Sequence, residues 1–434
     1  MKKFSLLIGI LFLTLVTVGC QTGDKYDLYV FNFKAEVKDE LKALVNEYGE
    51  ANDLNVKIMT VGGGQDTAQA MRAEMSKQDK PTIFNIGGPQ DLVDWEGYLA
   101  DLSDMTITQN TQQAYLAPVS QGGNVYGVPM AIEGYGFVYN TEILSQAGID
   151  PKGITSFADL KAAVEAIDAK KDELGIDAVF SYPTKETWVT GLHSSNIPLA
   201  FEFYNEGIAG IGDAETIDFS YAPEFKKLID LQAQYTVEGA IARENNQQGI
   251  APGLNNVTYT DQVQALAQGK VAMIQQGNWI YPDLEQYSEE AGNEVAANVG
   301  IIPMFLDHDN FPNTIPIGVP SYWAVNAKVS EDKQQTSKDF LDWMYTEKGD
   351  FVVEEMKFIS PYTTIEKLPE DPLAQDVLKY SNLDVAPLPW VFTAYPPTWG
   401  MDEFGVRIQD YVAGNKSWNE TITESKAEWK NLSR

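Results

Sequence analysis

The stretch Leu28-Tyr29-Val30-Phe31-Asn32-Phe33 begins the pattern that decides the fold of this chain. Its β-branched and aromatic side chains predict a strand. The apolar residues that follow recur at the spacing of an amphipathic helix: Val37, Leu41, Leu44, Val45 and Tyr48. Further strands are expected over 55–61 and 82–86, with a helix over 67–76 between them. Strands that alternate with helices indicate βαβ units, so we predict an α/β fold built on a parallel sheet.

Each of these predicted strands ends in glycine or short polar residues: NFK at 32–34, GGGQD at 62–66 and GGPQ at 87–90. In open α/β sheets, ligands bind in the crevice beyond the carboxyl ends of the strands. Glycine also lets backbone N–H groups approach a ligand closely. Ordinary turns favour the same residue types, but several such loops along one sheet edge favour a binding site. Its candidate residues are Asn32, Lys34, Gly64, Gln65 and Asp66.

Composition narrows the possible functions. The chain has 434 residues, a length that suits two domains, and 44% of them are hydrophobic, as in a globular protein. Its 62 acidic against 31 basic residues argue against nucleic acid as a partner, because neutralising phosphates requires clustered Lys and Arg. The same excess argues against anionic substrates and mainly aids solubility. The 9 Trp, 21 Tyr and 19 Phe mostly fill cores, but a carbohydrate binder also needs flat rings on which sugar CH faces stack.

The N-terminus has the layout of a secretory signal. Lys2 and Lys3 supply a charged region, and the apolar run over 4–18 is shorter than the ~20 residues that span a bilayer. Cys20, the only cysteine, follows this run, and a signal that ends at a lone cysteine resembles the lipobox of bacterial lipoproteins. The resemblance implies a signal peptide over 1–19, lipid (palmitate) on Cys20, a tether over 20–25 and a protein anchored to the cell membrane outside the cytoplasm. An ordinary cleaved signal and a free buried thiol are the alternatives.

The sequence shows no motif for covalent chemistry. His193 and His308 are the only histidines and lack the spacing of a zinc-binding helix. A nucleophile elbow and a P-loop are missing, and DHDN at 307–310 lacks the glycine and the terminal glutamate of a calcium loop. We therefore expect no catalytic residue, no metal and no cofactor. A carboxylate pair for glycoside hydrolysis stays open, because sequence spacing does not give the separation of two carboxylates in space.

Several motifs in a fixed order resemble a family of transport proteins. They are NVYGVP at 124–129, GYGFVYN at 134–140, AGI at 147–149, FADL at 157–160, GKVAM at 269–273, GNW at 277–279, FLDWM at 340–344 and SP at 360–361. Together they are similar to the family 1 extracellular solute-binding proteins of ABC importers, the group that includes maltose- and raffinose-type binding proteins. Their order and spacing carry this resemblance, since each motif alone is weak.

The resemblance implies a two-lobed, periplasmic-binding-protein-like fold. Each lobe would be a mostly parallel sheet flanked by helices, with a hinge between the lobes. The N-terminal lobe would comprise residues 26–132 and 319–358, and the C-terminal lobe residues 133–318 and 359–434.

The chain would cross between these lobes near 131–134, 317–322 and 358–361. Members of the family close on their ligand by hinge motion, one of the standard modes of conformational change. The resemblance therefore implies a monomer that performs no covalent chemistry. It would bind an oligosaccharide and deliver it to the transmembrane subunits of an ABC permease.

A neutral sugar offers hydroxyl edges, which suit carboxylates and amides, and apolar CH faces, which suit Trp and Tyr. Because charge-assisted hydrogen bonds are roughly twice as strong as neutral ones, Glu133 and Asp66 are the leading acceptors, and Lys34 and Gln65 the leading donors. Glu133 could instead form an interlobe salt bridge. Trp279 is the leading stacking residue. The remaining candidate ligand-binding residues are Asn32, Gly64, Tyr135, Trp188, Gly277, Asn278, Tyr322, Trp323, Trp390 and Trp399.

Two other functions share these features. A secreted glycoside hydrolase also requires an acidic cleft rich in aromatic residues, and turnover of a chromogenic glycoside would distinguish it. A sensory receptor module that signals once its ligand is bound requires the same closing motion as a transport protein. Adjacent permease genes would favour transport. A binding protein for an oligosaccharide importer is the main prediction.

Overall fold

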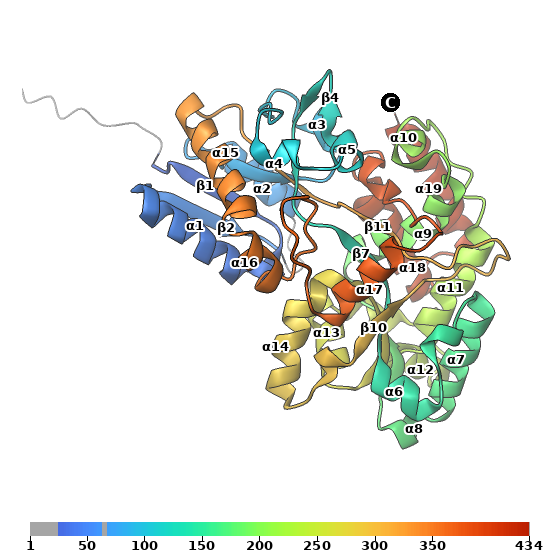
Figure 1. Cartoon of the computed structure of the whole chain (residues 1–434). Coiled ribbons are helices and arrows are strands. Elements are labelled where there is room, and N and C mark those ends of the chain that lie inside the picture. The colour runs from blue at the N-terminus through green and yellow to red at the C-terminus, as the bar shows by residue number, and fades with distance from the viewer. Residues whose placement is uncertain (1–24, 63–66, 434) are drawn as a thin grey trace, which may run out of the picture.

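The computed structural model describes residues 25–62 and 67–433, which form two five-stranded sheets on opposite sides of the molecule (Figure 1). The first sheet has the strand order β2-β1-β3-β12-β6. Its strands are β1 (Leu28–Asn32), β2 (Val56–Thr60), β3 (Ile83–Ile86), β6 (Val128–Pro129) and β12 (Tyr322–Val325). β1 runs parallel to β2 and β3, whereas β12 runs antiparallel to β3 and β6.

Helices cover the first sheet and complete its core. They are η1 (Ala35–Val37), α1 (Lys38–Asn52), α2 (Thr67–Met75), α3 (Pro89–Asp94), α4 (Thr106–Gln109), α5 (Gln113–Leu116), η2 (Ala117–Val119), α15 (Glu331–Thr346) and α16 (Gly349–Glu354). α1 buries the apolar residues whose spacing predicted it, from Leu41 to Tyr48, against β1 and α15. A small ladder of β4 (Ser120–Gln121) and β5 (Asn124–Val125) lies at the edge of this half.

The second sheet has the strand order β10-β7-β9-β8, and β11 pairs with the first part of β7. Its strands are β7 (Glu133–Asn140), β8 (Ala178–Ser181), β9 (Val271–Gly277), β10 (Val299–Ile302) and β11 (Ile317–Gly318). β7 and β9 are buried along their whole lengths. They are the central strands of the second sheet.

Helices on both faces of the second sheet form its two hydrophobic cores. They are α6 (Thr141–Ala147), α7 (Phe157–Ala169), α8 (Lys171–Leu174), α9 (Ser195–Glu202), α10 (Gly207–Gly212), α11 (Ala222–Gln234), α12 (Val237–Glu244), α13 (Tyr259–Ala267), α14 (Tyr281–Ala291), α17 (Pro372–Ser381), α18 (Val406–Ala413) and α19 (Trp418–Leu432). The short 3-10 turns are η3 (Pro151–Gly153), η5 (Pro252–Asn256), η6 (Asn278–Ile280), η7 (Val295–Ala297) and η8 (Val391–Ala394). Two π-helical segments complete this half: η4 (Val189–Ser194) and η9 (Trp399–Gly405).

Short connections join the two halves. β6 leads into β7, and β11 leads into β12, through a few residues each. Phe358 belongs to the core of the first sheet, whereas Ile359 belongs to a core of the second and forms an isolated bridge with Ile132. These crossings therefore lie side by side. The lobe boundaries stay a prediction. They place residues 360–365 with the second sheet, but Tyr362 packs in the core of the first sheet.

The α/β prediction is confirmed, but the expectation of mostly parallel sheets requires a correction. Parallel pairing joins β1 to β2 and β3, and β8 to β9. The pairings of β7 with β9, β10 and β11, and those of β12, are antiparallel. The physical reason is the connectivity: parallel neighbours need a long crossover, whereas β7 and β12 enter directly from the other half. None of the described helices has the length and apolar character needed to cross a membrane.

Candidate functional site

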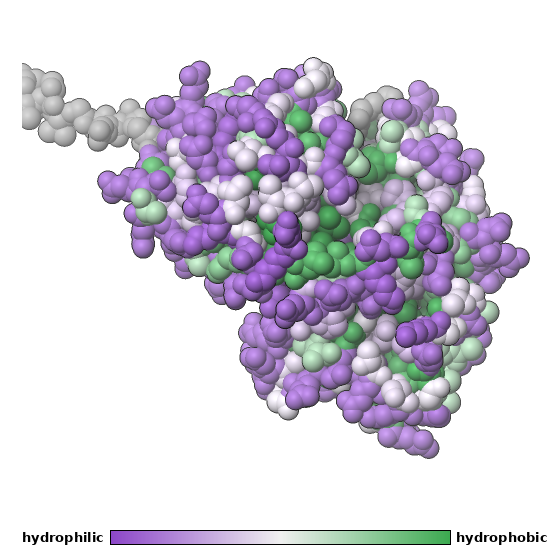
Figure 2. All heavy atoms as spheres, in the orientation of Figure 1, coloured by the Kyte–Doolittle hydropathy of each residue, from purple (hydrophilic) through white to green (hydrophobic). Residues whose placement is uncertain are grey.

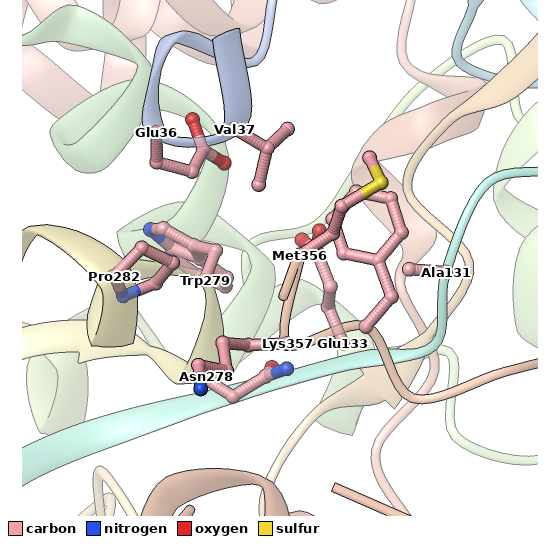
Figure 3. Close-up of a pocket in the computed structure, with 10 residues that line it drawn as sticks. Glu36, Val37, Ala131, Glu133, Asn278, Trp279, Pro282, Met356 and Lys357 are labelled. Atoms are coloured by element: carbon pink, nitrogen blue, oxygen red, sulfur yellow. The ribbon is translucent and has the colours of Figure 1, made fainter. Parts of the chain in front are cut away.

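A pocket lies where the two halves meet the connections between them (Figure 3). The first half contributes Glu36 and Val37, the second half Asn278, Trp279 and Pro282, and the connections Ala131, Glu133, Met356, Lys357 and Phe358. It encloses about 250 Å³ of empty space, part of it open to solvent. Figure 2 shows apolar side chains gathered in the hollow between the two halves, on a face that is otherwise largely hydrophilic.

Lys34 is held beside this pocket by the loop that follows β1. The Asn32 side chain shapes the loop: its Oδ1 accepts from the Lys34 backbone N–H at 3.1 Å, and its Nδ2 donates to the Lys34 carbonyl at 2.7 Å. Lys34 is only 5% exposed. Its Nζ lies 3.1 Å from a carboxylate oxygen of Glu36 and closer still to one of Glu133. Burial alone would lower the pKa of Lys34, but the carboxylates of Glu133 and Glu36 raise it above its usual value. Lys34 is therefore a permanent cation.

Glu133 thus forms a buried ion pair with Lys34 between the two halves. This is the interlobe salt bridge that the sequence offered as the alternative role of Glu133. Such a pair requires good geometry and further hydrogen bonds to compensate for its desolvation. The Glu36 carboxylate supplies the second partner of Lys34, so the cluster carries two acidic groups for one basic group. This group of charges forms a polar patch at one side of the pocket and gives it a net negative charge.

An aromatic box surrounds His193 next to these charges. We define it by five rings whose centroids lie 4.6 to 5.6 Å from the imidazole: Tyr135, Trp188, Trp279, Trp390 and Phe392. Tyr135 stacks on the imidazole at 4.6 Å and 19°, and its hydroxyl donates to the His193 carbonyl at 2.8 Å. Burial, and then the positive charge of Lys34, lower the pKa of His193 to about 3, so this side chain is neutral.

Local backbone features place these rings. A Cβ on Gly191 in η4 would lie 1.9 Å from the carbonyl oxygen of Gly400 in η9, so glycine allows the two π-helical segments to touch. This contact fixes η4, which carries His193. Gly277 leaves room for the ring of Trp279, whose Nε1 donates to Gln276 at 2.9 Å. Trp279 therefore folds back over the end of β9 and contacts both cores of the second half.

The structure brings together some of the expected residues and separates others. Glu133, Asn278 and Trp279 border the pocket, and Lys34 contacts Glu133 beside it. Tyr135, Trp188 and Trp390 belong to the adjacent box. Three of the expected residues are instead buried in cores, which argues against a place in the site. They are Trp323, which donates to Tyr345, Tyr322, which packs with Phe31 and Phe84, and Trp399, which donates to the Ser425 carbonyl. Gly64, Gln65, Asp66 and Cys20 lie outside the described residues.

His193, Phe392 and Glu36 were missed by sequence reasoning. His193 was tested only against the spacing of metal ligands, and no cluster suited to a metal exists among the residues that the structure describes. Glu36 lies two residues after Lys34, so an oppositely charged neighbour was the available signal. Phe392 carried no signal beyond its nearness to Trp390.

Two lobes around a cleft with an aromatic and charged lining define a solute-binding protein. Residues 43–367 match the family described as bacterial extracellular solute-binding protein, so the chain belongs to this family. Its members and the structural neighbours below are binding proteins, so the chain is a binding protein and not an enzyme. This finding sets aside the glycoside hydrolase interpretation.

The chain is 25% identical over 303 residues to a multiple sugar-binding protein of Streptococcus mutans, and the alignment covers 66% of each protein, just under two thirds. Among solved structures, it resembles a chitin oligosaccharide binding protein with 17% identity and a TM-score of 0.73, over 94% of this chain and 99% of the other. It also resembles RafE in complex with raffinose, with 17% identity, a TM-score of 0.71 and the same coverage. The apo form of RafE from Streptococcus pneumoniae gives a TM-score of 0.64, with 17% identity over 94% of this chain and 98% of the other. These likenesses confirm the two-lobed fold.

Proposed function

We propose that this protein captures an uncharged oligosaccharide in the cleft between its lobes and delivers it to an ABC permease. The observation that carries the proposal is the juxtaposition of the aromatic box with the Lys34, Glu36 and Glu133 cluster at one cleft. Rings suit the CH faces of a sugar, while charged groups make strong hydrogen bonds to its hydroxyls. The sugars named for the multiple sugar-binding, chitin oligosaccharide and raffinose proteins support this ligand class.

Closure of the lobes is part of the proposal. The halves touch where Gly88 meets Thr393 and where α14 contacts η1, and the chain is nearer in shape to the raffinose-bound than to the apo form of RafE. The pocket has room for about one water molecule, since only about 10 Å³ of it can take the centre of a water-sized sphere. An oligosaccharide therefore enters an open form, and contacts with both lobes favour the closed form by their differential affinity.

The proposed contacts follow from this arrangement. Trp188, Trp279 and Trp390 supply ring faces, and the Lys34 and Glu133 pair supplies donors and acceptors, supported by Asn278 and by Asn32 in the loop of Lys34. Gly64, Gln65 and Asp66 lie outside the described residues and belong to the proposal through the sequence alone. The lobe boundaries at 132/133, 318/319 and 358/359 are likewise proposed.

Export and anchoring are further steps of the same proposal. An importer component of this class has to remain near its permease, and the sequence of the leader favours a lipid on Cys20. One acyl chain gives only marginal membrane binding, so stable anchoring takes more than one. We expect Cys20→Ala to move the protein from the membrane to the soluble fraction while leaving sugar binding intact, as judged by fractionation and calorimetry. Retention of the variant on the membrane would contradict the lipoprotein proposal.

A thermal-shift screen tests the main proposal. The panel contains raffinose, stachyose, maltotriose, chitotriose and xylotriose, with glucose and galacturonic acid as controls. A sugar at 100 times its dissociation constant should add about 2.7 kcal/mol to the free energy of unfolding. We expect at least one neutral oligosaccharide to raise the melting temperature and the acidic sugar to have no effect. If no sugar of the panel has an effect, the proposal is wrong.

A further inference from the structure

We propose that His193 is a specificity-determining residue of the cleft: its imidazole, together with the indole N–H of Trp390, hydrogen-bonds the hydroxyls of one sugar residue seated against the aromatic box. This inference rests on the proposed function and identifies the part of the site that distinguishes sugars by the positions of their hydroxyl groups. It concerns a residue for which the sequence offered no role.

The first argument is that these polar groups are free to bind a ligand. Buried polar atoms in folded proteins are almost always hydrogen-bonded, and each exception needs an explanation. His193 is only 9% exposed, but its ring nitrogens are not among the fully buried polar atoms without a partner, so they are open to a ligand or to water. Trp390 is 2% exposed, and its Nε1 has no partner among the described residues.

Comparison with the other tryptophans shows that the Trp390 N–H is unusual. The indole nitrogens of Trp188, Trp279, Trp323, Trp399, Trp418 and Trp429 all donate to named acceptors. The remaining tryptophans, Trp95 and Trp343, are partly exposed to water. The fold therefore satisfies its buried indoles everywhere except beside His193, where the two rings lie 5.6 Å apart.

The second argument concerns the chemistry of the imidazole. A neutral imidazole offers one donor and one acceptor, which suits a hydroxyl group because a hydroxyl both donates and accepts. Burial and the nearby Lys34 cation keep His193 neutral, so it keeps this pairing across the physiological pH range. A ligand carboxylate would meet Glu36 and Glu133 in a cluster with a net negative charge. The ligand class that suits this cluster and the proposed function is therefore a sugar without acidic groups.

The third argument is that the fold holds the imidazole in a fixed orientation. Tyr135 stacks on one side and holds the His193 carbonyl, while η4 is fixed against η9 through Gly191. A site built to hydrogen-bond a hydroxyl discriminates strongly against analogues that lack it, because the polar groups of the site are then left unpaired. The buried Trp390 Nε1, which has no partner among the described residues, is such a group in the sugar-free protein.

Two substitutions test the proposal with the sugar of the panel that binds the wild-type protein most tightly. His193→Phe and Trp390→Phe each retain an aromatic ring and remove the polar nitrogens. By calorimetry, we expect each to weaken binding about tenfold, the equivalent of ~1.4 kcal/mol. Thermal melting of the sugar-free variants measures separately the core packing that Trp390→Phe loses. Trp429→Phe removes a buried indole N–H distant from the cleft and is the matched control, with affinity unchanged. Equal affinity for wild type and both variants overturns the inference while the proposed function stands.

Nitrogen-15 NMR of the histidine side chains gives a measurement that does not depend on the variants folding. The chain has only two histidines, so His308 serves as an internal reference. We expect the saturating sugar to shift the His193 ring resonances and leave those of His308 in place, with His193 remaining neutral down to pH 5. Unchanged His193 resonances at saturation would overturn the inference. If no sugar of the panel binds the wild-type protein, the proposed function fails first, and the inference fails with it.

Discussion

Trp279 shows how one residue can serve both the cleft and the core. Its indole N–H donates to Gln276 at 2.9 Å, its ring contacts both cores of the second half, and it borders the pocket beside Asn278. Aromatic contacts are worth about 0.5–1.5 kcal/mol beyond the area they bury. The exposed part of the ring is therefore available to a sugar, while the buried part is anchored.

We predict that Trp279→Ala weakens oligosaccharide binding by ~2 kcal/mol or more, roughly thirtyfold in affinity. Because the ring also fills core space, the variant should melt at a lower temperature without sugar. Trp279→Phe should recover part of both losses. Calorimetry and thermal melting of the same samples separate the two effects. Trp343→Ala, on the far side of the first half, should lower stability alone. Near-normal affinity in a folded Trp279→Ala protein would remove Trp279 from the site.

The sequence predicted part of the site at this scale. Residue types and local position picked out Lys34, Trp188, Trp279 and Trp390, which the fold brings to one cleft. Sequence could not predict that Phe392 and His193 meet, because residues that far apart in the chain are joined only by the packing of η4 against the C-terminal segments. For the same reason Trp399, which looks like Trp390 in sequence, lies in a core.

Element by element, the prediction was best where local periodicity decides the structure. β1, β2, β3, α1 and α2 fall within a few residues of their predicted ranges. The strand β12 was missed, since residues near 322 were assigned to a crossing between lobes. There, pairing with β3 and β6 determines the structure, and local sequence does not report it.

Helix α17 begins at a buried carboxyl that should make stability depend on pH. Asp371 caps this helix, its Oδ1 accepting from the Ala374 N–H at 2.8 Å, while its Oδ2 has no partner among the described residues. Burial raises the pKa of Asp371 from 3.8 to about 6. The unfolded chain releases this proton near pH 4 and the folded protein only near pH 6, so Asp371 lowers stability as pH rises from about 4 to 6.

We predict that Asp371→Asn stabilises the protein at pH 7 and has no effect near pH 4. Asparagine caps helices as well as aspartate does and carries no charge. The gain should be at most about 3 kcal/mol, from roughly two pKa units at ~1.4 kcal/mol each. Urea denaturation at both pH values measures it, with Asp384→Asn in the exposed loop after α17 as the control. An equal effect at the two pH values would contradict this explanation.

For the whole molecule, Gly88 and Thr393 mark one place where the two halves meet outside the connections. A Cβ on Gly88 would lie 3.1 Å from the Thr393 Cβ and 3.2 Å from its carbonyl oxygen. Gly88 follows β3 of the first sheet, and Thr393 lies within η8 of the second half. A side chain at position 88 should therefore act as a wedge against the closed form.

We predict that Gly88→Val weakens oligosaccharide binding about tenfold, since a cost of ~1.4 kcal/mol on the closed form reduces affinity by that factor. Solution scattering should show that the sugar reduces the radius of gyration of the wild-type protein and reduces that of the variant less. Gly153→Ala, where nothing lies within 4 Å of the new Cβ, is the control. A variant that closes and binds like wild type would show that Gly88 and Thr393 do not limit closure.

The place of β12 between β3 and β6 has a consequence for the synthesis of this protein. A ribosome or an export channel releases the chain from its N-terminus, and domains generally fold as they emerge. Here the first sheet cannot close until Val325 has emerged, after every strand of the second sheet. Until then β3 presents an unpaired edge, the kind of surface that invites aggregation. The first sheet, whose first strand is made first, thus waits for a strand that is made after every strand of the second sheet, and a chain released before Val325 would leave the β3 edge exposed.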